Sequence, residues 1–505
     1  MTENLYSVIR ERFADADKTF IEGQDGTICS YGELDSRSAQ FARALVELGV
    51  EPGDRVAAQV DKSTEAILLY LGCLRAGAVY LPLNSGYTAA EIEYFLGDAG
   101  PKVAVCRPKV QEQFRAIAAS TGVPHVETLA ADGSGSIAEK AAAAGRSFGV
   151  VERSKDDLAA ILYTSGTTGR SKGAMLTHGN LTSNAEVLAG AWRFTSEDVL
   201  LHALPIFHTH GLFVATNVAL LTGSSMLFLP GFDLDEVLRL LPRASVMMGV
   251  PTFYTRLLSS AAFDRELVSH MRLFVSGSAP LSPETHKEFE ARTGHAILER
   301  YGMTETNMNS SNPYHGARRP GTVGFALPGV EIRVANPETG RPLEQGEVGV
   351  IEIRGPNVFK GYWRLPEKTA AEFRDDGFFI SGDLGRFDEQ GYLSIVGRDK
   401  DLIISGGYNV YPAEVEAALD ALDEVAESAV VGLPHADFGE GVTAVVVPKK
   451  ADAGLSEQSV REALVEVLAK YKVPKRVLCV DSLPRNAMGK VQKKLLRETY
   501  ADIYR

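Results

Sequence analysis

The chain has 505 residues, of which 45% are hydrophobic and 23% are charged. These fractions are typical of folded globular proteins, so they exclude a disordered, collagen-like or low-complexity chain. The 65 acidic and 52 basic side chains give a net charge of −13. This balance argues against general nucleic-acid binding, because that activity needs a positively charged surface.

The sequence lacks the usual signals for export or membrane insertion. Its N-terminus has no long apolar segment, and the apolar stretch 199–230 is interrupted by histidines, prolines and other polar residues. The four cysteines are far apart and form no Cys-x-x-Cys pair, so we expect reduced core residues. We therefore expect a cytoplasmic protein with no membrane span and no nucleic-acid partner.

Strand-like and helical segments alternate through the first part of the chain. Ser30 and Glu33 have the spacing of a capping box, and they precede a helical pattern that Gly49 is expected to end. Apolar segments then alternate with a helix near residues 65–74, which is typical of parallel sheets with helices on their faces. The small, polar stretch 130–149 is predicted to be a surface connection.

The pattern changes in the second part of the chain. After Gly321, short strand-like segments separated by Gly, Pro and Asp predict a β-rich subdomain. A compact tail follows Gly397-Arg398, and Pro412 begins a helix there. A second helix is predicted from apolar residues at helical spacing: Val460, Leu464, Val467, Leu468 and Tyr471. We therefore predict two domains, 1–397 and 398–505.

The strongest local motif is the segment Tyr163–Gly173, which follows the strand-like sequence LAAIL. Its glycines allow backbone N–H groups to approach a ligand, its hydroxyls can donate to oxygens, and Lys172 supplies positive charge. This chemistry suits phosphate. The segment is not a Walker A loop, because Ser171 stands where that motif has glycine before its lysine.

This segment resembles the signature loop of the adenylate-forming enzymes, the family of acyl-CoA synthetases, peptide-synthetase adenylation domains and luciferases. Five further segments resemble motifs of that family and follow in its order: Tyr301–Glu305, Ser381–Asp383, Gly397–Asp401, Gly406–Asn409 and Asn486–Lys490. The resemblance implies an α/β protein. Its large N-terminal domain would hold two α/β subdomains with parallel sheets plus a β-rich subdomain, and its small, mobile C-terminal domain would be α+β.

The resemblance also implies an ATP- and Mg²⁺-dependent ligase that forms an acyl-adenylate and passes the acyl group to coenzyme A. Lys490, Thr304 and Glu305 would be catalytic, and Glu305 and Thr164 would bind the metal. The ATP-binding residues would be Thr164, Ser165, Gly166, Thr167, Thr168, Gly169, Lys172, Ser278, Ala279, Glu299, Tyr301, Thr304, Asp383, Arg398 and Lys490. The residues that serve the second half-reaction would be Lys400 as the hinge and Gly406, Gly407 and Tyr408 as the coenzyme A site.

The acid is predicted from the segments Leu204–Gly211 and Val250–Arg256. Together with the lysine motif they closely resemble the malonyl-CoA synthetase family, whose corresponding arginine binds the far carboxylate of malonate. Arg256 inherits that role, with His208 and Ser278 as substrate-binding neighbours. Arginine pairs with carboxylate through two hydrogen bonds, and a buried guanidinium without a partner is costly. An Arg256 that points outward to a surface acid remains an equal alternative on periodicity alone.

Other functions remain open at this stage. The enzyme could activate methylmalonate as a second substrate, or it could be a synthetase for another short, medium-chain or aromatic acid. It could load a carrier protein in place of free coenzyme A, and a non-catalytic nucleotide-binding protein is the remaining alternative. A protein acetyltransferase acting on Lys490 is a further candidate partner.

Overall fold

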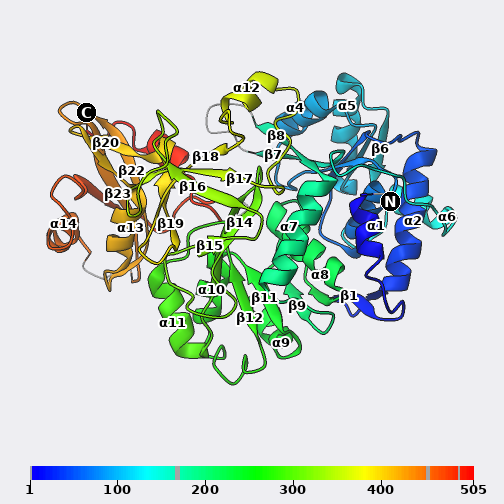
Figure 1. Cartoon of the computed structure of the whole chain (residues 1–505), viewed down its shortest axis with the longest axis horizontal. Helices are drawn as coiled ribbons and strands as arrows, with labels where there is room; N and C mark the ends of the chain where they lie inside the picture. The colour runs from blue at the N-terminus through cyan, green and yellow to red at the C-terminus, as the bar shows by residue number, and fades with distance from the viewer. Residues whose placement is uncertain (1–2, 165–170, 451–454, 487–488, 505) are drawn as a thin grey trace.

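The computed structural model describes residues 3–164, 171–450, 455–486 and 489–504. It contains four sheets, three in the N-terminal part and one in the C-terminal part. Figure 1 shows the C-terminal part, in orange and red, beside the larger N-terminal part. No helix among the described residues is long and apolar enough to cross a membrane.

The first α/β unit is built on a six-stranded sheet in the order β6-β5-β3-β4-β7-β8. All of its pairings are parallel except β7 with β8. Its strands are β3 (Arg55–Gln59), β4 (Val79–Pro82), β5 (Val103–Cys106), β6 (His125–Thr128), β7 (Leu158–Thr164) and β8 (Lys172–Thr177). The accompanying helices are α2 (Tyr31–Glu47), α3 (Thr64–Arg75), α4 (Ala89–Ala99), α5 (Gln111–Thr121) and α6 (Ser136–Ala143), with a 3₁₀ turn at Pro108–Val110.

Local sequence signals account for most of these helices. The predicted capping box is confirmed, because the Ser30 hydroxyl accepts from the backbone of Glu33 and the Glu33 carboxylate accepts from that of Ser30. The prediction for residues 130–149 is wrong in part. Helix α6 lies within this stretch, and its side chains Ile137 and Ala141 are buried against the core.

The second α/β unit contains a nine-stranded sheet in the order β15-β14-β13-β12-β11-β9-β10-β1-β2. Its central strands are parallel, and antiparallel strands lie at both edges. The strands are β1 (Thr19–Gly23), β2 (Ile28–Ser30), β9 (Val199–His202), β10 (Ser225–Phe228), β11 (Val246–Gly249), β12 (Leu273–Ser276), β13 (Leu298–Met303), β14 (Asn307–Ser311) and β15 (Phe325–Ala326). The helices are α1 (Leu5–Arg10), α7 (His178–Ala191), α8 (Asn217–Thr222), α9 (Leu234–Leu240), α10 (Pro251–Leu258) and α11 (Pro283–Thr293), with a π-helix at His210–Thr216 and a 3₁₀ turn at Leu241–Arg243.

The predicted β-rich subdomain is a four-stranded antiparallel sheet in the order β16-β17-β18-β19. Its strands are β16 (Glu331–Ala335), β17 (Gly349–Arg354), β18 (Phe379–Phe387) and β19 (Leu393–Arg398), and α12 (Pro366–Ala371) lies between β17 and β18. The chain then passes through a 3₁₀ turn at Asp399–Asp401 into the C-terminal part.

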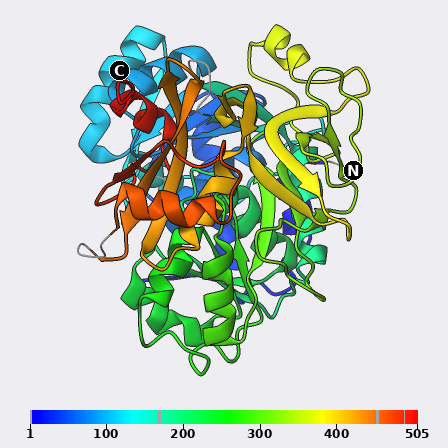
Figure 2. The ribbon, with the colours of Figure 1, turned by 90° about the vertical axis from the view of Figure 1, so that its left-hand side faces the viewer.

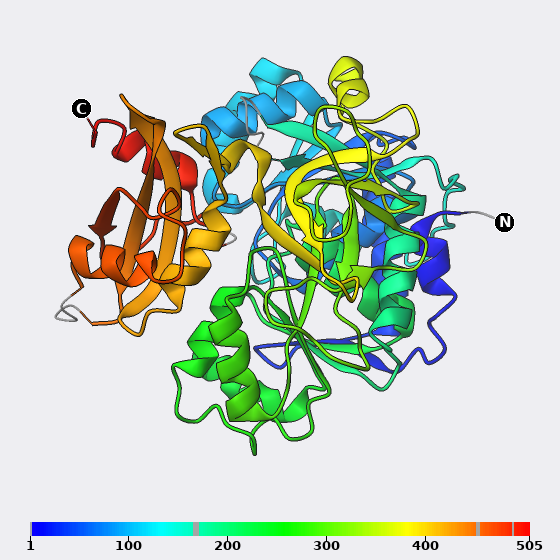
Figure 3. The ribbon, with the colours of Figure 1, turned by 60° about the vertical axis from the view of Figure 1, so that its left-hand side comes forward.

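The C-terminal part has a five-stranded sheet and its own apolar cores, formed by residues between Ile403 and Tyr504. The strands are β20 (Ile403–Ser405), β21 (Tyr408–Val410), β22 (Val425–His435), β23 (Gly439–Pro448) and β24 (Arg476–Cys479), and the helices are α13 (Pro412–Asp420), α14 (Glu457–Val465) and α15 (Lys493–Thr499). Figures 2 and 3 show this part as a separate layer beside the N-terminal sheets. These separate cores support the predicted boundary near residue 398, which stays a prediction.

The second predicted helix of this part is shorter than its apolar pattern indicated. Helix α14 ends at Val465, and Val467 is 68% exposed. Leu468 and Tyr471 still pack against the core from the segment that follows. The helical spacing of apolar residues therefore extends past the end of the helix, because the loop that follows also packs against the same core.

Candidate active site

The adenosine end of the predicted nucleotide site contains an oriented carboxylate. Asp383 on β18 accepts a hydrogen bond of 2.6 Å from the Tyr301 hydroxyl, and its second oxygen lies 3.4 Å from Nε of Arg398. Tyr301 comes from β13 and Arg398 from the end of β19, so three strands bring these predicted residues together. A carboxylate held in this way can accept hydrogen bonds from the two hydroxyls of a ribose.

The predicted phosphate site begins at the facing ends of β7 and β8. Thr164 ends β7 and Lys172 begins β8, and the two residues pair across the antiparallel ladder. The Lys172 ammonium lies 3.0 Å from a carboxylate oxygen of Glu372 and 3.9 Å from the ring centre of Tyr362. The remaining predicted phosphate-binding residues, Ser165, Gly166, Thr167, Thr168 and Gly169, lie outside the described residues.

Thr304 and Glu305 lie in the turn between β13 and β14. Glu305 is only 6% exposed, and one of its oxygens lies 3.1 Å from the Tyr362 hydroxyl. Burial raises the pKa of this carboxyl group, which nearby positive charge would oppose. Among the described residues, no group of three or more His, Cys, Asp or Glu side chains could hold a metal by itself. A single carboxylate fits Mg²⁺, which keeps several waters and binds substrate phosphates.

Lys490 reaches this site from the C-terminal part. Its backbone N–H donates to the side chain of Asn486, and the turn at Gly489 lies against Thr252 of α10. Burial first, and then the charges of Arg398 and Arg300, lower the pKa of its ammonium to about 8, although Asp383 and Glu305 act in the opposite direction. Lys490 is therefore within electrostatic range both of the predicted nucleotide residues Asp383 and Glu305 and of Arg300.

Two of the predicted acid-binding residues, His208 and Ser278, lie beside His210, the first residue of the π-helix. The backbone N–H of His210 lies 3.3 Å from Nδ1 of His208, and Nδ1 of His210 lies 3.2 Å from the Ser278 hydroxyl. Burial lowers the pKa of both imidazoles, that of His208 to about 3, so both rings are neutral at physiological pH. Ser278 has a positive φ of 72°, which turns the segment Ser276–Pro280 toward these rings.

The side chain of Arg256 lies outside this pocket. Arg256 lies on α10, its side chain is exposed, and its guanidinium is 5.9 Å from the ring centre of Phe232. The expected burial of Arg256 is therefore wrong, because its position on the helix carries the side chain toward solvent. Its role in substrate binding stays a prediction.

The buried guanidinium of this region belongs to Arg300, which the sequence analysis did not single out. It lies on β13 and is 4% exposed, and its Nε and Nη2 have no hydrogen-bond partner in the part of the chain that the structure describes. Burial lowers the pKa of Arg300 to about 9, and its charge lowers the pKa of His208 and His210. The available signal was strand alternation, which places Arg300 on the face opposite Glu299.

In the described ranges, two other predicted ATP-binding residues make no side-chain contact that points to a nucleotide. Glu299 faces α11, where one of its oxygens lies 3.3 Å from Nδ1 of His286. Ala279 follows Ser278 in the turn after β12 and makes no side-chain hydrogen bond, as alanine has no polar side-chain atom. Contact of these two residues with a nucleotide stays a prediction.

The predicted coenzyme A residues form the turn between β20 and β21. Gly406 and Gly407 both have positive φ, 60° and 81°, as this two-residue hairpin requires. Tyr408 is 59% exposed and stacks on Tyr471 of the same part, with ring centres 4.7 Å apart. Lys400, the predicted hinge, lies in the 3₁₀ turn that joins the two parts.

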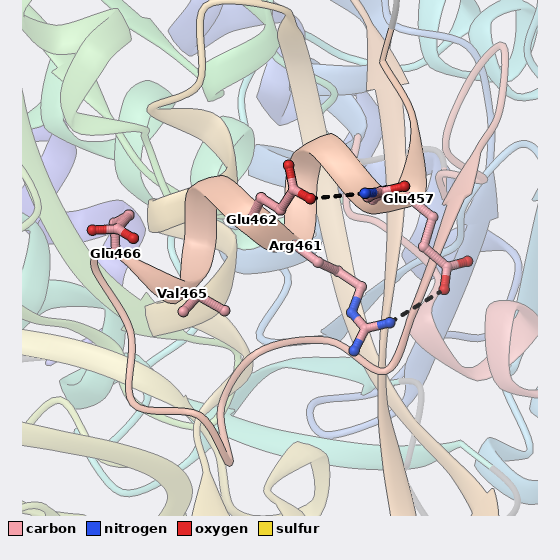
Figure 4. A pocket seen from close by; sticks show the side chains of 6 residues that line it. Glu457, Arg461, Glu462, Val465 and Glu466 are labelled. Atoms are coloured by element: carbon pink, nitrogen blue, oxygen red, sulfur yellow. Dashed lines mark hydrogen bonds and ion pairs between the residues drawn. The ribbon is translucent and has the colours of Figure 1, made fainter.

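A large surface pocket lies elsewhere, along α14. Figure 4 shows its lining side chains, among them Glu457 and Arg461, which form an ion pair of 3.8 Å. Its volume is about 650 Å³, and none of the predicted site residues that the structure describes lines it. The motif residues therefore mark a different place from this open, charged surface.

Comparisons with known proteins agree with this geometry. The AMP-binding enzyme family matches residues 10–363, and the AMP-binding enzyme C-terminal domain matches residues 414–490. A malonate–CoA ligase of Arabidopsis thaliana is 35% identical over 98% of this chain and 89% of its own length. A feruloyl-CoA synthase of an Amycolatopsis species is 37% identical over 94% of each chain.

Solved structures are more similar still. The ATP-bound MatB of Rhodopseudomonas palustris is 60% identical, covers both chains completely and superimposes with a TM-score of 0.98. The apo form of the same protein gives a TM-score of 0.86. The described arrangement of the whole chain is thus closer to the ATP-bound form. Together with the motif residues gathered around Lys490, these matches show that the chain belongs to the AMP-binding enzyme family.

Proposed function

We propose that this protein is an AMP-forming malonate–CoA ligase. It would join malonate to ATP with release of pyrophosphate, and then transfer the malonyl group from the adenylate to coenzyme A with release of AMP. The similarity to malonate–CoA ligases from Arabidopsis and mammals supports this proposal. Similarity to a feruloyl-CoA synthase and to a long-chain-fatty-acid–CoA ligase leaves the acid to be argued from the pocket.

The observation that carries the choice of malonate is the buried guanidinium of Arg300, whose Nε and Nη2 have no hydrogen-bond partner among the described residues. A charged group in this environment needs an anion, because its desolvation is otherwise uncompensated. An apolar acid would leave Arg300 unpaired, whereas the second carboxylate of a diacid can accept two hydrogen bonds from it. The neutral imidazoles of His208 and His210 and the Ser278 hydroxyl would complete the polar side of the pocket.

The nucleotide residues would then perform the first half-reaction. Asp383 would hold the ribose, Lys172 would bind the β- and γ-phosphates, and Thr304 would contact the α-phosphate. Glu305, with Thr164, would hold Mg²⁺, which neutralises phosphate charge when it is bound. Lys490 would bridge the near carboxylate of malonate and the α-phosphate, so that both reactants are aligned for attack.

The second half-reaction would use the Gly406–Tyr408 turn for coenzyme A, after rotation about Lys400. In this proposal the mobile domain is residues 398–505. A cytoplasmic location and activity on methylmalonate remain predictions. Nothing in the comparisons supports the predicted acetyltransferase partner.

An AMP-release assay with coenzyme A tests the proposal. We expect high activity with malonate, less with methylmalonate, and little with acetate, succinate or benzoate. Arg300→Met should lower kcat/KM for malonate by about 100-fold or more, since breaking a buried charge pair costs about 3–5 kcal/mol, while acetate activity stays level or rises. Arg256→Leu is the matched comparison: a loss as large as that of Arg300→Met would restore the predicted role of Arg256. Preference of the wild-type enzyme for acetate or benzoate would contradict the proposal.

A further inference from the structure

One tyrosine connects the predicted phosphate-binding and metal-binding side chains. Tyr362 is 2% exposed, and its hydroxyl lies 2.6 Å from one oxygen of Glu372 and 3.1 Å from one oxygen of Glu305. The Lys172 ammonium lies over the ring of Tyr362 and contacts the other oxygen of Glu372. A single phenol therefore contacts Lys172, Glu305 and Glu372 at once.

Backbone hydrogen bonds hold Tyr362 in this place. The segment 359–363 pairs with β8 on one side, where Trp363 N–H donates to Gly173 at 2.7 Å. On the other side the N–H of Phe359 donates to the backbone carbonyl of Glu305 at 2.8 Å. Because both attachments involve backbone, the ring is positioned independently of any ligand. A nucleotide would meet this arrangement already formed.

Glu372 is the anion that Lys172 contacts in this structure, and under the proposed function a phosphate oxygen would compete with it for that contact. Its two oxygens contact the Lys172 ammonium at 3.0 Å and the Tyr362 hydroxyl, and the Lys368 ammonium lies 2.8 Å from it as well. If Lys172 turned to a phosphate, Glu372 would retain Tyr362 and Lys368 as partners. The exchange would therefore leave no buried charge without a partner.

We propose that Tyr362 and Glu372 are positioning residues for nucleotide binding: Glu372 holds Lys172 until a triphosphate displaces it, and the Tyr362 hydroxyl orients Glu305 toward the metal. This inference rests on the proposed function, which places phosphate at Lys172 and Mg²⁺ at Glu305. Neither residue touches the reacting atoms. Glu372 would affect the affinity for the triphosphate itself, and Tyr362 would affect the affinity for the triphosphate with bound metal.

Calorimetric binding of ATP and AMP to the full chain, with and without Mg²⁺, tests the pair. Removing the competing charge in Glu372→Gln should tighten ATP binding about fivefold and leave AMP binding unchanged, since Lys172 then gives up only a hydrogen bond to a neutral amide. Tyr362→Phe keeps the ring beneath Lys172. It should weaken ATP binding about fivefold with Mg²⁺ and leave metal-free ATP binding unchanged.

Matched variants control for general effects on folding. Tyr392→Phe removes another buried phenol, which donates to the carbonyl of Ala317, and Glu22→Gln breaks a surface ion pair with Arg243. Both should bind ATP and AMP as the wild type does. The inference is overturned if Glu372→Gln changes ATP and AMP affinity equally, or if Tyr362→Phe weakens metal-free ATP binding as much as metal-bound.

A further variant separates this inference from the proposed function. Lys172→Met should weaken ATP binding by at least tenfold, since it removes the predicted phosphate ligand itself. If it does so while Glu372→Gln and Tyr362→Phe behave like their controls, only the present inference fails. If Lys172→Met has no effect on ATP, the assigned phosphate site fails with it.

Discussion

Lys490 is held among other cations, and this determines the pH range in which it can act. Its pKa is lowered to about 8 by burial first and by Arg398 and Arg300 next. The ammonium therefore predominates below pH 8 and is lost above it. A neutral amine could neither bridge two anions nor stabilise charge that develops on the α-phosphate.

We predict that malonate-dependent exchange of pyrophosphate into ATP declines as pH rises through about 8. The expected slope is tenfold per pH unit, as for loss of one essential proton. Lys490→Arg keeps its charge at these pH values, so its lower activity should show no such decline. Measuring the exchange without coenzyme A avoids ionisation of the thiol. The same decline in Lys490→Arg would assign the titration to another group.

Individual site residues could be predicted from the sequence where they belong to a motif that itself indicates their chemical role. Tyr301, Asp383 and Arg398 were predicted from three separate motifs, and the structure brings them into contact. Arg300 was missed because only its burial, which a sequence does not state, distinguishes it from any other arginine on a strand. Tyr362 was missed because its partners lie 57 and 10 residues away and share no pattern with it.

Among the elements, the turn after β12 determines how closely Arg300 can pack. A Cβ at Gly277 would lie 2.4 Å from Cζ of Arg300, far inside van der Waals contact. A Cβ at this position would therefore force the guanidinium to move, so glycine is favoured here by its neighbour and not by its own φ. The turn and β13 consequently form one side of the acid pocket together.

We predict that Gly277→Ala displaces Arg300 and lowers kcat/KM for malonate by about 10- to 100-fold, since overpacking costs about 1–3 kcal/mol. The residual activity with acetate should change much less, because that acid has no far carboxylate. Gly231→Ala is the matched control, since a Cβ there has no neighbour within 4 Å. Steady-state assays with both acids check this. Equal losses with malonate and acetate would show a general distortion of the site.

Most elements could be predicted, and the exceptions have physical reasons. The capping box at Ser30 and the proline at the start of α13 are local signals, and both helices begin where expected. Helix α6 was missed because its alanine-rich sequence resembles a polar connection. Only the burial of Ile137 in the core distinguishes it, and the sequence does not show that burial. The length of α14 was overestimated because Leu468 and Tyr471 reach the same core without a helix.

For the whole molecule, the charges of two carboxyl groups act on each other across the boundary between the N-terminal and C-terminal parts. Asp420 on α13 and Glu284 on α11 each have a buried oxygen without a hydrogen-bond partner among the described residues. Burial raises the pKa of Asp420 to about 7, with further contributions from Glu416, Glu284 and Glu427. Of these acids only Glu284 belongs to the N-terminal part, so its contribution depends on the arrangement described here.

We predict that this arrangement loses stability relative to a rotated one as pH rises toward 7. Asp420 is protonated here up to about pH 7. A rotated arrangement loses the contribution of Glu284 and keeps those of Glu416 and Glu427, so the pKa of Asp420 would be lower there. The cost therefore grows between these two pKa values, by at most about 1.4 kcal/mol per pH unit, and is constant above them. Energy transfer between dyes on the two parts measures the population. Asp420→Asn should flatten its change between pH 5.5 and 7, and an unchanged profile would contradict the assignment.

The exposed Gly406–Tyr408 turn and Lys490 belong to the same small C-terminal part. If the two halves of the proposed reaction use them in turn, that part presents one of them to the reaction centre at a time. The thiol would then have no binding site while the mixed anhydride forms. The mixed anhydride would accumulate on the enzyme before the acceptor binds. Without the acceptor, each polypeptide would retain one molecule of mixed anhydride and release one of diphosphate.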